Sequence, residues 1–156
     1  MQADFIVLGA RVINGEGTPA YVADIAVVDD QIVAIGDLSQ WHAGQTVQAK
    51  GKVVAPGFID PHVHHDEAVL TDPLLTCMTS QGVTSVINGN CGFSIAPLTK
   101  AGPLPAPLDL ILDDHRERFN SYAAYRTALE TSPPAVNSAC LIGHGSLRVN
   151  EVRDLS

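Results

Sequence analysis

A chain of 156 residues with 46% hydrophobic and 17% charged residues can form one domain with a sizeable core or two small domains, and it is too apolar to be disordered. Its nine Lys and Arg residues are outnumbered by seventeen Asp and Glu residues, and the net charge of −8 argues against a nucleic-acid partner, which requires a basic face. The three cysteines are too few and too scattered for a disulfide framework. No apolar run approaches the roughly 18 to 20 residues that span a bilayer, which argues against a membrane protein. Because the sequence also shows no recognisable signal peptide, a cytoplasmic location is predicted.

The first 57 residues are predicted to form a β-rich module. Residues 4–13, DFIVLGARVI, are apolar and β-branched as in a strand, and the turn sequence NGEG follows. Residues 23–38 read as two strands joined by a hairpin at DDQ. Residues 45–57 predict a short strand, a Lys-Gly turn and a further apolar step that ends at Pro-Gly. We therefore expect a β-module at 1–57 and a second domain at 58–156.

After Pro56 the pattern changes to alternating strands and helices. The predicted elements, in chain order, are a strand at 57–64, a helix at 71–82, a strand at 83–88, a loop rich in Pro and Gly at 93–109, an amphipathic helix at 113–131 and a third strand at 138–148. Such alternation is typical of an α/β fold with parallel strands, whose carboxyl ends lie on one side of the sheet.

Polar clusters follow all three predicted strands. They are HVHHDE (62–67), NGNCG (88–92) and GHG (143–145). The carboxyl side of parallel strands is where ligands bind, both in a (β/α)₈ barrel and in a doubly wound sheet. The second domain is therefore predicted to carry its functional site at this side.

Two histidines and one cysteine are the candidate metal ligands. His62 and His64 lie two positions apart, so an extended backbone directs both imidazoles to the same side, where they can bind one zinc ion. A polar loop with a chance run of histidines is the competing interpretation. Cys91 stands in a Gly-rich turn rather than in an apolar run, which favours a thiolate ligand, with a nucleophilic thiol as the competing role. Cys77 and Cys140 are expected to be small buried hydrophobic residues.

Four further polar residues are candidates for supporting a metal ligand or for contacting the substrate. Asp66 can accept a hydrogen bond from the second ring nitrogen of a metal-bound histidine, or it belongs to a solvated acidic turn together with its neighbours. His144 can bind substrate or orient a ligand, or it is an ordinary loop residue. His65 and Asn90, which adjoin the proposed ligands, complete this group.

Taken together, GFIDPHVHHDE, SQGVTSVINGNCGFSIAPL and GHGSLR resemble the N-acyl-D-amino-acid deacylases (D-aminoacylases) of the amidohydrolase superfamily. The step PGFID-x-H-x-H is common to much of the superfamily, whereas GVT-x-V-x-x-GNCG followed by S-x-APL is specific to the D-aminoacylase branch. The resemblance extends from Ala3 to about Arg148.

The resemblance implies part of an N-terminal β-sandwich followed by the first three strands of a metal-dependent (β/α)₈ TIM barrel. It places the family's zinc ligands on His62, His64 and Cys91. The bound zinc ion would polarise the amide carbonyl of a small-molecule N-acyl-D-amino acid and activate water, which releases a carboxylate and a free D-amino acid.

A complete barrel takes about 250 residues, so this chain is expected to be an N-terminal fragment, truncated and inactive alone. The family's later histidine ligands, its general acid and base and its substrate contacts would lie outside it, on the same chain, a complementing chain or another copy. Two alternatives stay open. One is a cyclic-amide hydrolase like the hydantoinases, although that branch uses a carboxylated lysine where this chain has Cys91. The other is a non-catalytic metal-binding or assembly protein that needs a partner chain.

Overall fold

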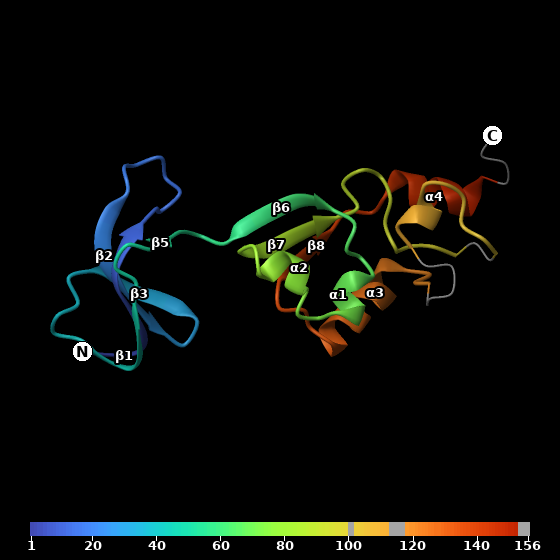
Figure 1. Ribbon diagram of the computed structural model, residues 1–156. Coiled ribbons are helices and arrows are strands. Elements are labelled where there is room, and N and C mark those ends of the chain that lie inside the picture. The colour runs from blue at the N-terminus through green and yellow to red at the C-terminus, as the bar shows by residue number, and fades with distance from the viewer. Residues whose placement is uncertain (100–101, 113–117, 153–156) are drawn as a thin grey trace. The chain divides into compact units, whose positions relative to one another are not determined.

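The computed structural model of the protein describes residues 1–99, 102–112 and 118–152. The chain divides into two compact units, Met1–Pro56 and Gly57–Ser156 (Figure 1). The first unit consists of strands and their connections, and the second combines strands with short helices. None of the helices within the described ranges is long and apolar enough to cross a membrane.

The first unit is one five-stranded sheet. Its strands are β1 (Gln2–Val12), β2 (Tyr21–Val28), β3 (Gln31–Gly36), β4 (His42–Gln48) and β5 (Val53–Val54). They are arranged in the order β3-β2-β1-β4, and β5 pairs with the far end of β1. The predicted strands are confirmed, although the last apolar step is reduced to the two residues of β5.

The hairpin predicted at DDQ connects β2 and β3, where Val28 pairs with Gln31. Asp29 has a φ of 51°, in the left-handed region that Asp tolerates in turns. Its N–H donates to Asp4 Oδ2 on β1 at 2.8 Å. The turn is therefore held by a neighbouring strand as well as by its own backbone conformation.

A three-stranded parallel sheet forms the centre of the second unit. It contains β6 (Phe58–Val63), β7 (Val83–Asn88) and β8 (Asn137–Cys140) in that order. Both strand pairs are parallel, so the three carboxyl ends lie on one side, as the arrows in Figure 1 show. The predicted α/β class with parallel strands is confirmed for this unit.

The helix predicted at 71–82 is wrong. The structure has two single-turn helices instead, α1 (Ala68–Thr71) and α2 (Thr76–Thr79). Leu75 between them has a φ of 43°, and a right-handed helix cannot continue through a left-handed residue. The side chain of Leu75 is fully buried, which supplies the packing energy that stabilises this conformation.

The helix predicted at 113–131 is α3 (Tyr122–Thr131). Residues 113–117 lie outside the described residues, and residues 118–121 precede the helix. Ser121 is the N-cap, because its Oγ accepts the N–H of Ala124 at 3.2 Å. Tyr125 is the fully buried residue of the apolar face of α3, and its ring packs edge-on against Phe119.

The third predicted strand, at 138–148, is too long. Strand β8 ends at Cys140, and helix α4 (His144–Glu151) begins at the polar sequence that was predicted to end the strand. The apolar residues Leu141 and Ile142 are half exposed in the connection, where Leu141 N–H donates to Asn88 O at 2.9 Å. An apolar run does not reveal by itself where a strand stops.

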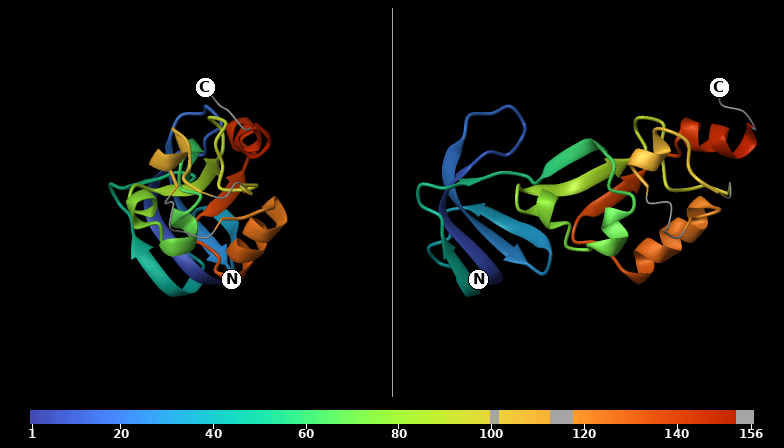
Figure 2. Two further views of the ribbon diagram at one scale, coloured as in Figure 1. Left: turned by 90° about the vertical axis from the view of Figure 1, so that its right-hand side faces the viewer. Right: turned by 45° about the vertical axis from the view of Figure 1, so that its right-hand side comes forward.

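The core of the second unit lies between the sheet, the helices and the two described segments 93–99 and 102–112. Helix α1 contacts α3 and α2 contacts β7, in agreement with the views of Figure 2. A short 3-10 helix, η1 (Leu108–Leu110), lies near the end of the 102–112 segment, and its residue Leu108 is completely buried. The buried core residues are Val63, Val69, Leu75, Val86, Ile95, Ala96, Leu98, Leu104, Leu108, Leu112, Phe119, Tyr125, Val136 and Val149.

Candidate metal centre

His62 and His64 lie at the carboxyl end of β6, on either side of the buried residue Val63. This alternation follows from the extended backbone, which sends Val63 into the core and both imidazoles outwards. The two ring centroids are 5.6 Å apart. Asp60 stabilises the strand end, because its Oδ1 accepts the N–H of His62 at 3.1 Å.

Cys91 comes to the same place from the neighbouring strand. It follows β7 in a tight turn, in which Gly92 N–H donates to Gly89 O at 3.0 Å. Cys91 Sγ lies 3.4 Å from Nε2 of His64. Among the described residues, His62, His64 and Cys91 form the cluster that could hold a metal ion, with one ligand atom from each within 4.8 Å of the others.

The geometry of this cluster fits zinc. Tetrahedral zinc binds His nitrogen and Cys sulfur at about 2.0–2.3 Å, which holds neighbouring ligand atoms roughly 3.5 Å apart. The separation of 3.4 Å between the thiol and the nearer imidazole nitrogen matches this value. All three side chains are exposed, so an ion and a further ligand can reach them.

Glycine residues allow the Cys91 turn to approach the β8–α4 connection closely. Gly89 has a φ of 81°, and a Cβ there would collide with the backbone oxygen of Leu141. Gly143, on the facing segment, would place a Cβ 2.7 Å from Cα of Phe93. The position of Cys91 therefore depends on small residues on both sides of this contact.

Asn90 links the same turn to β6. Its Nδ2 donates to the carbonyl oxygen of Pro61 at 3.0 Å, so the chain just before Cys91 is joined to the chain just before His62. The sequence alone left open whether Asn90 supports a metal ligand or contacts the substrate. Its observed contact connects the two segments that supply the candidate ligands.

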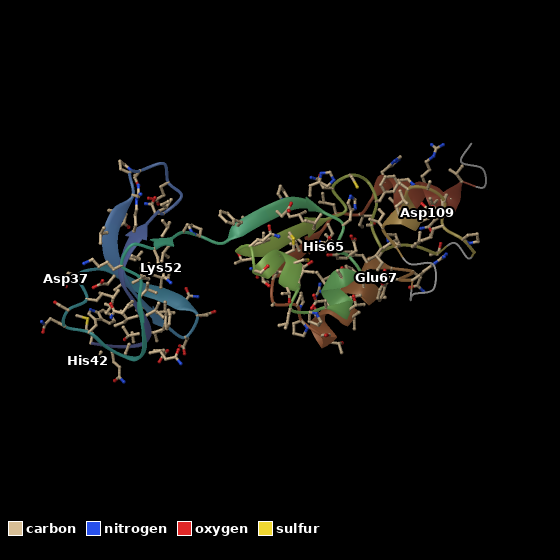
Figure 3. The ribbon with its side chains drawn as sticks, viewed as in Figure 1. Asp37, His42, Lys52, His65, Glu67 and Asp109 are labelled. Carbon is tan, nitrogen blue, oxygen red and sulfur yellow. The ribbon has the colours of Figure 1, made fainter. Side chains whose placement is uncertain are left out.

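His65 and Asp66 continue from the histidine pair into the connection between β6 and α1, where Figure 3 labels His65 and Glu67. The backbone N–H of His65 donates to Asn88 Oδ1 at 2.9 Å. Asp66 is buried, and its Oδ1 accepts the N–H of Ile95 at 3.3 Å. The interpretation of Asp66 as part of a solvated acidic turn is therefore wrong, because its carboxylate packs inside the unit.

Burial raises the pKa of the Asp66 carboxyl, and the Ile95 N–H and the nearby charges of His64 and His65 offset this only in part. The backbone oxygen of Asp66 accepts the hydroxyl proton of Tyr125 at 2.8 Å. Tyr125 is itself buried, and this raises the pKa of its phenol. Helix α3 is thereby connected to the residues that follow the histidine pair.

His144 stands at the first position of α4 and is exposed. The residues on either side of it hold the helix start against the Cys91 turn. Gly145 N–H donates to Gly92 O at 2.7 Å, and Gly143 N–H donates to Ser94 Oγ at 2.9 Å. His144 therefore belongs to a helix start that contacts the segment following Cys91, although it is not one of the three residues that form the cluster.

Three buried polar residues that support the site are not among the individually predicted site residues. Asn88 is fully buried at the end of β7 and bonds to His65, while Ser94 and Ser146 bond to each other across the contact between the 93–99 segment and α4. Ser146 Oγ accepts the N–H of Ser94 and donates to its carbonyl oxygen, both at 2.8 Å. Asn88 is the last residue of the β-branched strand β7 and the first of the polar sequence NGNCG, which is the signal that could have identified it.

The other two cysteines have different surroundings. Cys140, at the end of β8, is half buried, which raises the pKa of its thiol. Cys77 on α2 is exposed, so the prediction that it is a buried hydrophobic residue is wrong. The reason is that the helix that would have buried it is reduced to a single turn.

The chain matches the family model described as "Amidohydrolase family" over residues 45–155. It is 48% identical over 152 residues to a D-aminoacylase of Alcaligenes xylosoxydans xylosoxydans, and this match covers 97% of this chain and 31% of that protein. It is 44% identical over 151 residues to an N-acyl-D-glutamate deacylase of the same organism, which covers 97% of this chain and 30% of that protein.

Two solved structures are similar to almost the whole chain. A D-aminoacylase crystal structure, described as defining a novel subset of amidohydrolases, matches with a TM-score of 0.92 and 47% identity, covering 98% of this chain and 32% of the other. The N-acyl-D-glutamate deacylase of Bordetella bronchiseptica, in complex with zinc and a phosphonate inhibitor, matches with a TM-score of 0.90 and 42% identity, covering 99% and 32%. The chain thus spans about a third of the length of these relatives.

Proposed function

Because the chain belongs to the amidohydrolase family, we propose that the whole protein is a zinc-dependent hydrolase that cleaves N-acyl-D-amino acids into a carboxylate and a free D-amino acid. The observation that carries this proposal is the convergence of His62, His64 and Cys91 from the ends of two adjacent parallel strands. Two relatives that align with almost the whole chain are a D-aminoacylase and an N-acyl-D-glutamate deacylase. Since the chain spans 31% of the first of these, the proposal concerns the activity of the whole protein.

The proposal extends to the architecture. The order β6-β7-β8, with each strand parallel to the next, is the order in which a (β/α)₈ barrel begins. We assign these strands to the first part of such a barrel, and the five-stranded sheet of Met1–Pro56 to part of a β-sandwich. The similarity to a D-aminoacylase structure over 98% of this chain supports this assignment.

A zinc ion bound at such a site polarises a carbonyl oxygen and lowers the pKa of a bound water molecule. The chain contributes His62 and His64 from one strand end and Cys91 from the next, so two elements of one sheet set the spacing of the ligands. Asn90 and Asn88 maintain that spacing through their bonds to Pro61 and His65. His144, exposed at the start of α4 beside the Cys91 turn, is assigned to the substrate side.

The cyclic-amide alternative is less well supported than cleavage of a linear amide. The position of Cys91 within reach of both histidines favours the D-aminoacylase assignment, whereas a hydantoinase-like centre would use a carboxylated lysine instead. No observation on the described residues favours a non-catalytic assembly protein over an enzyme.

The test uses the intact protein from its natural gene, stripped of metal and titrated with zinc. N-acetyl-D-amino acids, their L-enantiomers and a hydantoin serve as substrates. We expect hydrolysis of the D-compounds that increases up to one equivalent of zinc. Titration continues beyond one equivalent, because the binuclear centre of a D-aminoacylase relative is described as activated by one metal and attenuated by the second. Hydrolysis of the hydantoin alone, or of none of the compounds, would contradict the proposal.

A further inference from the structure

An apolar hollow of about 270 Å³ adjoins the candidate metal centre. Two of the candidate ligands, His64 and Cys91, form one side of it. The other side is made of Phe93, Pro107, Leu110 and Ile111, which come from the segment between β7 and α3. Because a water molecule takes up about 30 Å³ in the liquid, the hollow has room for a group of several non-hydrogen atoms.

The lining determines which chemistry the hollow can accept. Apart from His64 and Cys91, every lining residue is apolar, and none carries a positive charge. A carboxylate placed there would lose its hydration without gaining a cationic partner, which is costly. A hydrocarbon group would gain free energy by leaving water. The hollow is therefore suited to the uncharged end of a substrate whose polar bond lies at the metal centre.

We propose that this hollow binds the acyl group of the N-acyl-D-amino acid substrate, an inference that rests on the proposed function. The two sides of the scissile amide differ in chemistry. The amino-acid side carries the α-carboxylate, and the acyl side ends in hydrocarbon. With the amide carbonyl at His62, His64 and Cys91, the side that extends over Phe93 and Ile111 is the acyl side.

The apolar side of the hollow is anchored in the core. Leu110 and Ile111 line the hollow, and Leu108 and Leu112, on either side of them in the sequence, are both buried. Ile111 N–H donates to Leu108 O at 3.1 Å. Leu110, in contrast, is 82% exposed. A substitution at Leu110 therefore changes the hollow without removing a core contact, which makes it the position for a test.

The experiment measures kcat/KM of the zinc-loaded intact protein on two substrate series. The first lengthens the acyl group of one D-amino acid from acetyl through propionyl to butyryl. The second keeps acetyl and lengthens the amino-acid side chain by the same steps. We expect kcat/KM to rise about fourfold per methylene along the acyl series, the factor that corresponds to burying one methylene. Leu110→Asp is expected to reduce this factor to near one while leaving the factor of the side-chain series and the zinc content unchanged.

Leu74→Asp is the matched control, because Leu74 is also an exposed leucine, at 67%, and does not line the hollow. It is expected to change neither series. Leu110→Ala, a milder change, should lower the acyl factor in the same direction. Binding gives a readout that does not depend on turnover. Butyrate has two more methylenes than acetate, so it should bind the unaltered protein about 16-fold more tightly than acetate does.

The outcomes separate the two proposals. If the unaltered protein hydrolyses neither series, the proposed function fails. If it is active but shows no gain with acyl length, or if Leu110→Asp leaves that gain intact, only the acyl assignment fails. A change confined to the side-chain series would place the D-amino-acid side chain in the hollow and would also overturn the assignment.

Discussion

The side-chain oxygen of Asn88 accepts a hydrogen bond from the backbone N–H of His65 at 2.9 Å. This bond joins the end of β7 to the residue directly after His64, so the chain that carries one candidate ligand is held by the strand that leads to Cys91. Asn88 has no exposed surface, and the bond itself is partly buried, so competition from water is reduced. The relative position of the two strand ends depends on this contact.

Replacement of Asn88 by Ala should lower the free energy of unfolding by about 1–3 kcal/mol, because the partly buried N–H of His65 loses its acceptor. It should also weaken zinc binding, since it loosens the segment that carries His64. Denaturant unfolding and zinc titration measure the two effects. Asn137→Ala is the control, because Asn137 is exposed at the start of β8 and bonds to Thr84 O at 3.2 Å. Equal effects of the two substitutions would contradict the role given to Asn88.

Cys91→Ser should lower zinc content and hydrolysis together. Removing a residue that only hydrogen-bonds to a metal ligand typically lowers metal affinity by roughly 10- to 100-fold. Because Cys91→Ser removes a ligand itself, the loss of zinc affinity should be at least this large. Metal analysis of the purified variant after dialysis is the measurement. Cys77→Ser, which changes an exposed cysteine away from the cluster, should alter neither quantity. A Cys91→Ser protein that retains a full equivalent of zinc would rule out this ligand assignment.

Gly143→Ala should destabilise the protein and displace the Cys91 turn. A Cβ at this position would lie 2.5 Å from Gly92 O and 2.7 Å from Phe93 Cα, and both are backbone atoms that cannot rotate away. Overpacking of this kind costs about 1–3 kcal/mol. Thermal unfolding and zinc affinity should both decrease.

Gly44→Ala provides the comparison for this variant. Gly44 lies on β4 in the other unit, and its Cβ would meet Asp4 O at 3.3 Å, a contact that a small shift relieves. Zinc affinity should not change in Gly44→Ala. If Gly143→Ala binds zinc as tightly as the unaltered protein does, the close contact between the two segments does not position Cys91.

The thiol of Cys140 should be alkylated more slowly than that of Cys77 at pH 8. Burial, followed by the nearby charge of Asp66, raises the pKa of Cys140, so less of it is present as the reactive thiolate. Mass spectrometry of peptides after timed exposure to iodoacetamide gives both rates in one sample. Faster modification of Cys140 than of Cys77 would contradict the burial of Cys140 in the folded protein.

The same pKa shift predicts a change of stability with pH. The folded state raises the pKa of the thiol above its ordinary value of 9.0, so the folded state binds more protons than the unfolded chain between these two values. The contribution to stability is complete below the ordinary pKa and is lost as the pH rises through the folded pKa. Cys140→Ala should therefore flatten the alkaline side of the stability profile. An unchanged alkaline slope in this variant would show that another group is responsible.

Several features of the fold and the site could be predicted from sequence because they depend on local rules. The strands were found from apolar and β-branched runs, and their parallel order in the second unit from the alternation with helices. His62 and His64 were placed together because the two-residue period of a strand is a property of the backbone itself. The fold-class prediction for the second unit and the resemblance to the amidohydrolases rest on these local patterns.

The errors in element boundaries have a tertiary cause. The helix predicted at 71–82 is interrupted where Leu75 enters the core in a left-handed conformation. The strand predicted at 138–148 ends at Cys140, which pairs with Asn88, the last residue of the partner strand β7. In both cases the packing around the run, and not its residue types, determines where the regular structure stops. Local propensity does not contain that information.

The sequence by itself determined which residue types were available and which of them share a strand face, because these depend on backbone geometry over a few residues. Only the tertiary structure decided that Cys91 lies 3.4 Å from His64, that Asp66 is buried, and that the 107–111 segment forms an apolar side next to the cluster. These arrangements join residues up to some fifty positions apart, and they exist because burial of the core brings the strand ends and their loops together.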